Sequence, residues 1–160
     1  MKRLVALAAG LCALASAAQA QDIVRGGDPK SPIASVVTVP AGYDTIYVSG
    51  MTPPVIDDKA VGVARFGDTK TQTLGVLGRI EAALKSQGAT MADVVMMRVL
   101  LVGDPAKGGK MDFMGMMEAY KTYFGTAEQP NKPSRITSQI TGLVADGMLV
   151  EIEVQAARKK

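Results

Sequence analysis

Two stretches near the end of the chain, Pro133-Ser134-Arg135 and Val150-Glu151-Ile152-Glu153-Val154, decide how the rest of it is interpreted. Apolar and polar residues alternate over 135–140 and over 149–154, as they do in strands with one buried face. The turn residues Ala145-Asp146-Gly147 lie between the two segments. The sequence therefore predicts two antiparallel C-terminal strands that carry one arginine and two glutamates.

The side chains available for catalysis are few. The chain contains no histidine, and its single cysteine, Cys12, lies in an N-terminal segment that we expect to be removed. Cysteine–histidine nucleophiles and the common zinc sites are therefore excluded in the mature protein. Any catalysis would have to use an arginine, carboxylates, hydroxyls, backbone groups and water, and no cofactor or metal is expected.

Residues 1–20 have the features of a cleaved signal peptide. Lys2 and Arg3 precede an apolar run over residues 4–18, and Ala18-Gln19-Ala20 fits a cleavage site. We therefore expect a periplasmic or secreted protein, with no stable membrane association because the run is short for a membrane span. Of the 18 basic residues 16 remain after cleavage, against 15 acidic ones, so the net charge falls to +1. This balance does not favour nucleic acid as a partner.

The remaining 140 residues of the 160 are enough for one hydrophobic core. Residues 21–33 are polar and rich in Gly and Pro, which predicts a flexible lead-in to a single domain over 34–158. Strands are expected at 34–39, 45–49 and 93–102, with short pairing around 62–65, and helices at 68–87 and 111–124. This order, strand-strand-(strand)-helix-strand-helix-strand-strand, predicts an α+β fold: a mixed β-sheet with two helices packed on one face.

Helices on one face leave the other face of the sheet uncovered. If the isoleucines and valines of the final strands face the helices, Arg135, Glu151 and Glu153 project together from the uncovered face. No helix remains to cover Leu149 and its neighbours there, which predicts burial against another subunit.

The chain resembles the RidA/YjgF family of enamine/imine deaminases over residues 33–157. The resemblance rests on the order and spacing of short segments: Val48-Ser49-Gly50, Gly67-Asp68, Gln72-Thr73, residues 89–95 (ATMADVV), Met111-Asp112-Phe113, Ala119-Tyr120, Tyr123-Phe124, Pro133-Ser134-Arg135 and residues 149–154 (LVEIEV). It implies a chorismate-mutase-like fold, a homotrimer, and ligand clefts between neighbouring subunits.

The resemblance also implies a reaction, the hydrolysis of 2-imino acids or enamines to 2-keto acids and ammonia. Arg135 matches the family arginine that grips the substrate carboxylate, and Glu151 matches a glutamate near the water or ligand. Gly50 matches a glycine that lends backbone contacts, and Thr137 is a further candidate for substrate binding. The chemistry requires a carboxylate clamp, a positioned water and a group that moves protons.

Three positions depart from the family pattern, and they predict a more apolar cleft. Val36, Met117 and Ile136 stand where a tyrosine, an asparagine and a small polar residue are usual. Together with the export signal they favour a second hypothesis: a non-catalytic protein of the same fold that binds small carboxylates or acts as a stress-related holdase. The retained Arg135 favours the deaminase. Copper binding by the methionines is a further alternative, but their helical and strand spacing favours core filling.

Overall fold

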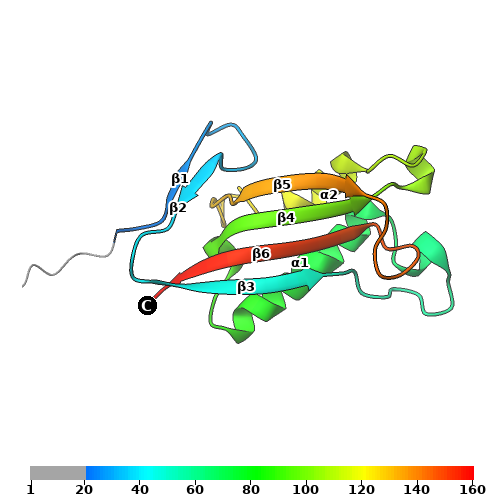
Figure 1. Cartoon of the computed structure of the whole chain (residues 1–160), viewed down its shortest axis with the longest axis horizontal. Helices are drawn as coiled ribbons and strands as arrows, with labels where there is room; N and C mark the ends of the chain where they lie inside the picture. The colour runs from blue at the N-terminus through cyan, green and yellow to red at the C-terminus, as the bar shows by residue number, and fades with distance from the viewer. Residues whose placement is uncertain (1–20) are drawn as a thin grey trace, which may run out of the picture.

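A four-stranded mixed sheet forms the centre of the structure, a computed structural model that describes residues 21–160 (Figure 1). In spatial order its strands are β3 (Tyr43–Met51), β6 (Val150–Lys159), β4 (Val94–Val102) and β5 (Ser134–Ile140). β6 runs antiparallel to β3 and β4, whereas β5 is parallel to β4. The two C-terminal strands thus run in opposite directions, as predicted, but β4 lies between them and they are not neighbours.

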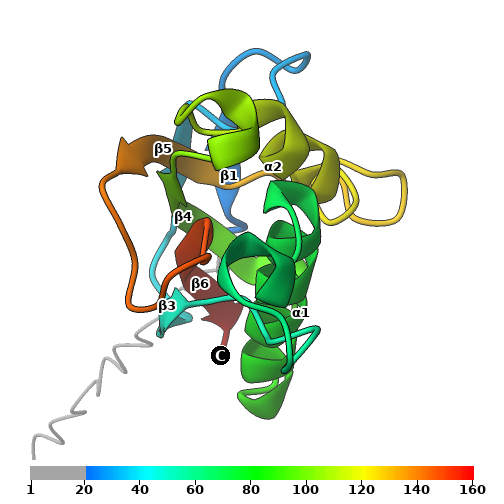
Figure 2. The ribbon, with the colours of Figure 1, turned by 90° about the vertical axis from the view of Figure 1, so that its right-hand side faces the viewer.

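Two helices cover one face of this sheet, as predicted (Figure 2). α1 (Thr69–Ser86) begins after Asp68, whose side chain accepts a hydrogen bond from the Thr71 amide at 2.8 Å. Its buried face supplies four core residues: Val76, Leu77, Ile80 and Leu84. α2 (Phe113–Tyr120) is shorter than the predicted helix over 111–124.

Three short 3-10 helices lie in the connections: η1 (Gly62–Arg65), η2 (Met91–Asp93) and η3 (Pro105–Lys107). The prediction of strand pairing around 62–65 is wrong, because the Phe66 amide turns back to the Val63 carbonyl at 3.0 Å. Gly62 and Gly67, on either side of this turn, both have positive φ angles, a conformation that disfavours an extended strand.

A small hairpin lies at one end of the sheet, where the sequence predicted a flexible lead-in. β1 (Val24–Gly26) pairs antiparallel with β2 (Val36–Thr38), the only part of the strand expected at 34–39 that forms. The Arg25 guanidinium donates hydrogen bonds to three backbone carbonyls of the main body: Ala92 at 2.9 Å, Val94 at 2.9 Å and Lys132 at 3.0 Å. These contacts fix the hairpin beside the start of β5.

One part of the predicted open face is misplaced. Glu151 and Glu153 lie on the uncovered face, but Leu149 is 2% exposed and belongs to the core between helices and sheet. The uncovered face instead exposes other large apolar side chains, among them Tyr47 at 75% and Ile136 at 49%.

The signal peptide predicted for residues 1–20 lies outside the described residues. Within residues 21–160, neither α-helix combines the length and the apolar character needed to cross a bilayer.

Candidate functional site

Arg135 lies on the helix-covered face of the sheet, and its guanidinium packs against α2. Nη2 lies 3.1 Å from the sulfur of Met117, and Nη1 lies 4.0 Å from that of Met116. The guanidinium carbon lies 4.5 Å from the ring centroid of Tyr120 and 5.9 Å from that of Phe113, both within cation–π range. A charged group is therefore held by two thioethers and two aromatic rings.

The local sequence of α2 explains this arrangement. Phe113, Met116, Met117 and Tyr120 recur at three- and four-residue steps, which places them on one face of the helix. The Tyr120 hydroxyl donates to the Pro32 carbonyl at 3.0 Å, and the Tyr120 ring also stacks on Phe124. Tyr120 therefore connects the N-terminal segment to the arginine.

Burial affects the charges at this site. Desolvation lowers the pKa of Arg135, an effect that Tyr120 partly offsets, yet a guanidinium stays cationic in proteins. Burial also raises the pKa of Tyr120 to about 12, so its hydroxyl remains a neutral donor at ordinary pH. No carboxylate of residues 21–160 lies within ion-pair distance of Arg135. Its positive charge is thus poorly hydrated and lacks a counter-ion in the described chain.

Arg25 and Arg135 differ in the acceptors that their guanidinium groups contact. Both guanidinium groups are half-buried, and burial lowers the pKa of each. Arg25 donates to three carbonyl oxygens, whereas the acceptors that residues 21–160 offer to Arg135 are two sulfur atoms, which accept weakly. Arg25 therefore has a structural function, while Arg135 has donors left for an oxygen ligand.

Thr137 lies on the same face of β5 as Arg135, two residues further along. Its hydroxyl oxygen is buried and has no hydrogen-bond partner in residues 21–160. In this conformation the hydroxyl is closed to a ligand that approaches from solvent.

Gly50 and Glu151 form a second pair of candidate residues, on the uncovered face. The pairing of β3 with β6 shifts between Val48 and Met51, so Gly50 lies at a bulge. A β-carbon at position 50 would overlap the Glu151 carboxylate, so any larger residue there would require the Glu151 side chain to move. The sequence alone did not predict this contact.

The structure does not bring the two pairs together within one chain. Arg135 is opposite the buried Met97 and Ile136 is opposite the exposed Arg98, so the prediction that Arg135 projects from the uncovered face is wrong. In β5 the isoleucine faces outward and the arginine faces α2. Arg135 and Glu151 consequently lie on opposite faces of the sheet, and a site that uses both needs more than one copy of the chain.

Of the three departures from the family pattern, only Met117 touches the arginine. Ile136 lies on the other face, and Val36 is 57% exposed on β2. The spacing of the α2 methionines predicted core filling, and nothing in the sequence connected them or Tyr120 with Arg135. Their common helical face was the available signal, but it became informative only once β5 was known to lie beneath it.

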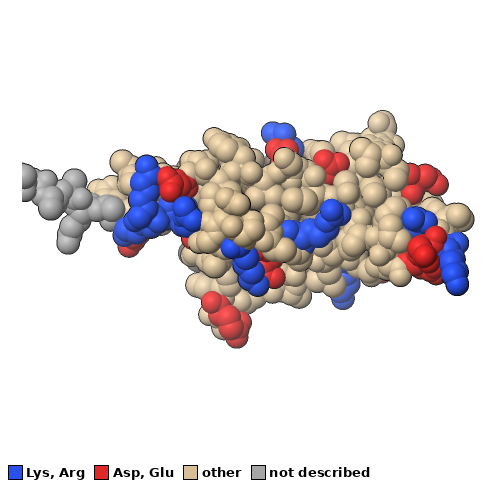
Figure 3. Space-filling view, turned by 90° about the horizontal axis from the view of Figure 1, so that it is seen from below, with Lys and Arg blue, Asp and Glu red and all other residues tan. Residues whose placement is uncertain are grey.

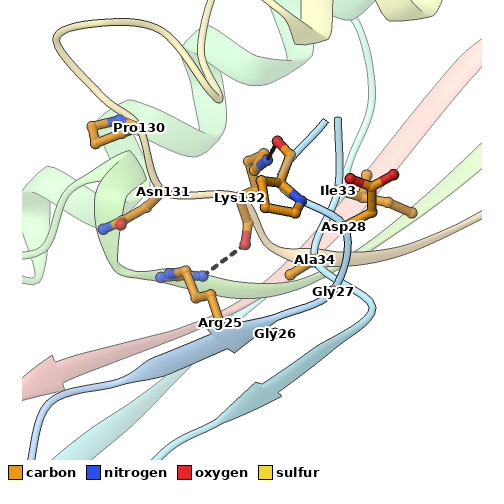
Figure 4. A pocket seen from close by; sticks show the side chains of 10 residues that line it. Arg25, Gly26, Gly27, Asp28, Ile33, Ala34, Pro130, Asn131 and Lys132 are labelled. Carbon is orange, nitrogen blue, oxygen red and sulfur yellow. Dashed lines mark hydrogen bonds between the residues drawn. The ribbon is translucent and has the colours of Figure 1, made fainter. Parts of the chain in front are cut away.

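A separate cavity of about 260 Å³ lies between the hairpin and residues 130–132 (Figure 4). Arg25 points at the Lys132 backbone there, and the Lys132 ammonium donates to the carbonyls of Pro29 and Ser31 at 3.0 and 2.7 Å. The cations of this cavity thus hold the hairpin in place. Within residues 21–160, no three His, Cys, Asp or Glu side chains gather as a metal site.

Comparisons with known proteins agree with this architecture. The family model described as Endoribonuclease L-PSP matches residues 29–158. A RutC family protein from Pyrococcus abyssi is 34% identical over 114 residues, 71% of this chain and 79% of that protein. A solved YjgF-family structure from Mycobacterium tuberculosis is 28% identical, with a TM-score of 0.52 over 84% of this chain and 98% of that one. A Rid family protein from Yersinia pestis has the same fold, with a TM-score of 0.64 at 20% identity over 85% of this chain and 98% of that one. With its two helices on a mixed sheet of the chorismate-mutase-like type, this chain belongs to the RidA/YjgF family.

Proposed function

We propose that this protein hydrolyses 2-imino acids to 2-keto acids and ammonia, at a site shared by two copies of the chain. The observation that carries the proposal is the half-buried Arg135 guanidinium, which faces only sulfur atoms and aromatic rings and has no carboxylate partner in residues 21–160. A planar carboxylate would supply the missing oxygen acceptors and the missing charge in a bidentate pair.

Glu151 is the proposed group that handles protons. As water adds to the C=N carbon of the substrate, the carboxylate accepts a proton from the water. The carboxylate passes this proton to the substrate nitrogen, which completes the carbinolamine. It then takes the proton of the new hydroxyl group and delivers it to the departing nitrogen as the C–N bond breaks, which releases ammonia and leaves the 2-keto acid. Gly50 allows close approach to this carboxylate because it has no side chain.

The shared site requires an oligomer, and we propose a homotrimer. Arg135 and Glu151 lie on opposite faces of one sheet, so the arginine of one subunit would have to meet the glutamate of its neighbour. Burial of Tyr47 and Ile136 by a second copy would supply hydrophobic stabilisation on the uncovered face. The signal peptide that the sequence predicts over residues 1–20 supports a further proposal, that the protein works after export, in the periplasm or outside the cell.

Two names among the relatives bear on the ligand. E. coli TdcF, at 22% identity, has been solved with bound serine, a small molecule with a carboxylate. The family description contains the word endoribonuclease, but RNA cleavage is not favoured here. The chain has no histidine to act as a general base, and 16 basic residues oppose 15 acidic ones over residues 21–160. On the face seen in Figure 3 the basic side chains lie in separate groups rather than in one continuous surface.

A binding protein without turnover is the second candidate. It is favoured by the separation of Glu151 from Arg135 within one chain, since the arginine could hold a carboxylate without any proton-transfer group nearby.

The two candidates differ in one assay. An amino-acid oxidase generates the imine from leucine, and semicarbazide traps what is not hydrolysed. The purified protein of residues 21–160 should lower semicarbazone formation if it is a deaminase. Binding of 2-keto acids with no effect on trapping at any protein concentration would support the binding protein instead.

A further inference from the structure

The part of the Arg135 site that a single chain supplies is lined almost entirely by apolar side chains. In residues 21–160 the side chains that contact the guanidinium are Phe113, Met116, Met117 and Tyr120. The single hydroxyl among these four already donates to the Pro32 carbonyl. None of the four has a free hydrogen-bond donor for the ligand's side chain, and the acceptors that remain are the Tyr120 oxygen and two weakly accepting thioether sulfurs.

Part of this lining is accessible to a ligand. Phe113 is 38% exposed although its ring lies beside the guanidinium, so an apolar surface borders the arginine on the solvent side. Met117 is 4% exposed, and its sulfur lies 3.1 Å from Nη2, one of the donors available to a bidentate carboxylate. A carboxylate bound there would displace or straddle the thioether, which brings the rest of the ligand against Met117.

We infer that the site selects 2-imino and 2-keto acids with apolar side chains, and that Met117 is the residue that determines this specificity. The inference rests on the proposed function. An apolar side chain gains by leaving water for the sulfur and ring surface, whereas a hydroxyl loses its hydration without a partner. Because methionine is flexible and polarisable, several apolar side-chain shapes should be accepted.

The size of the effect follows from the behaviour of apolar pockets. Discrimination by a few buried carbon atoms, or against an added hydroxyl, amounts to roughly 10- to 200-fold. We therefore expect 4-methyl-2-oxopentanoate to bind at least about ten-fold more tightly than 3-hydroxypyruvate. The ratio of the two affinities is the informative quantity, because a general loss of structure would weaken both ligands alike.

The test is calorimetric titration of both keto acids into the protein of residues 21–160 and four variants. Met117→Gln, a polar residue of similar shape, should reduce the ratio to within about three-fold of unity by giving the hydroxyl a partner. Met117→Leu should keep the preference for 4-methyl-2-oxopentanoate over 3-hydroxypyruvate, because leucine is also apolar. If the glutamine variant does not fold, loss of this preference in Met117→Leu would still contradict the inference. Met114→Gln, on the same helix but 63% exposed, is the matched control and should change nothing. Arg135→Ala is the fourth variant.

The outcomes separate this inference from the proposed function. Equal binding of the two keto acids by the wild type, or a ratio that does not change in Met117→Gln, overturns the specificity inference while Arg135→Ala still abolishes binding. If neither keto acid binds, or if Arg135→Ala binds as the wild type does, the carboxylate anchor itself is refuted, and the specificity inference with it.

Discussion

Replacing Arg135 by alanine should remove ligand binding and leave the chain folded. A bidentate pair between a carboxylate and a partly desolvated guanidinium contributes on the order of 2–5 kcal/mol. Since each 1.4 kcal/mol is about ten-fold, affinity for a 2-keto acid should fall roughly 30-fold to several-thousand-fold. Lysine offers a point charge in place of two parallel donors, so Arg135→Lys should restore little.

The cost in stability should be much smaller. Alanine removes a cation–π contact with Tyr120, which is worth about 0.5–2 kcal/mol. No ion pair within residues 21–160 is broken, so no carboxylate there is left unpaired. We therefore expect a cooperative unfolding transition in Arg135→Ala, displaced by no more than about 2 kcal/mol.

Calorimetric titration with 4-methyl-2-oxopentanoate and the semicarbazide assay measure the two properties. Arg65→Ala is the control, because Arg65 is bonded to the Asp58 carbonyl at the surface and has no place in the proposed site. Activity in Arg135→Ala within a few-fold of the wild type would refute the carboxylate anchor. Loss of the oligomer in this variant would instead assign Arg135 to subunit contacts.

Three further predictions concern Glu151, the oligomer and Tyr120. Glu151→Gln should lower kcat strongly while the Kd of a 2-keto acid stays unchanged, since a proton-transfer group acts mainly in the transition state; an unchanged kcat would reassign Glu151 to binding or structure. Light scattering on residues 21–160 should give three times the chain mass, and Ile136→Glu, on the uncovered face, should reduce it; a monomer in the wild type at micromolar concentration would refute the trimer. Burial raises the pKa of Tyr120 to about 12 in the folded chain, against about 10 in the unfolded chain. The neutral hydroxyl therefore contributes its full stabilisation of the fold below about pH 10, and this contribution declines as the pH rises towards 12. Urea unfolding at about pH 9 and pH 11 should therefore show a larger pH-dependent loss for the wild type than for Tyr120→Phe, and equal losses would contradict this assignment.

The elements that local patterns define were predictable. The helix predicted over 68–87 and the strand predicted over 93–102 are found as α1 and β4. Each has a clear local pattern, since Leu77, Ile80 and Leu84 recur at helical spacing and residues 94–102 are nearly all apolar. The hairpin was not predictable, because its stability comes from distant partners. Arg25 bonds to carbonyls 67 and 69 residues away, and nothing in the Gly- and Pro-rich segment around it indicates such contacts. Strand order has the same character, since the position of β4 between β5 and β6 depends on pairing that no single segment encodes.

The error on β5 has a different cause. Alternation places apolar residues inward, and in 134–140 the only strongly apolar residues are Ile136 and Ile140. The register with β4 decides otherwise: Met97 of the core lies opposite Arg135, so the arginine must face α2 and the isoleucine must face outward. The alternation rule assumes that a strand buries its apolar residues and solvates its polar ones within its own chain. In β5 neither holds, because Ile136 is exposed on the outer face and the charged Arg135 is half-buried on the inner face.

These two exceptions have one common explanation. In our proposal a second copy of the chain covers the half-exposed isoleucine on the outer face, and a carboxylate ligand neutralises the half-buried arginine, which has no anionic partner within residues 21–160. Sequences that specify a single fold tend to break local rules at functional sites. By this reasoning the orientation of β5 has a functional cause. It places Arg135 where, within residues 21–160, no acidic side chain neutralises its charge, so that a ligand can do so. Two structures would refute this common explanation. One is an oligomer in which Ile136 stays exposed, and the other is a ligand complex in which Arg135 keeps only its sulfur contacts.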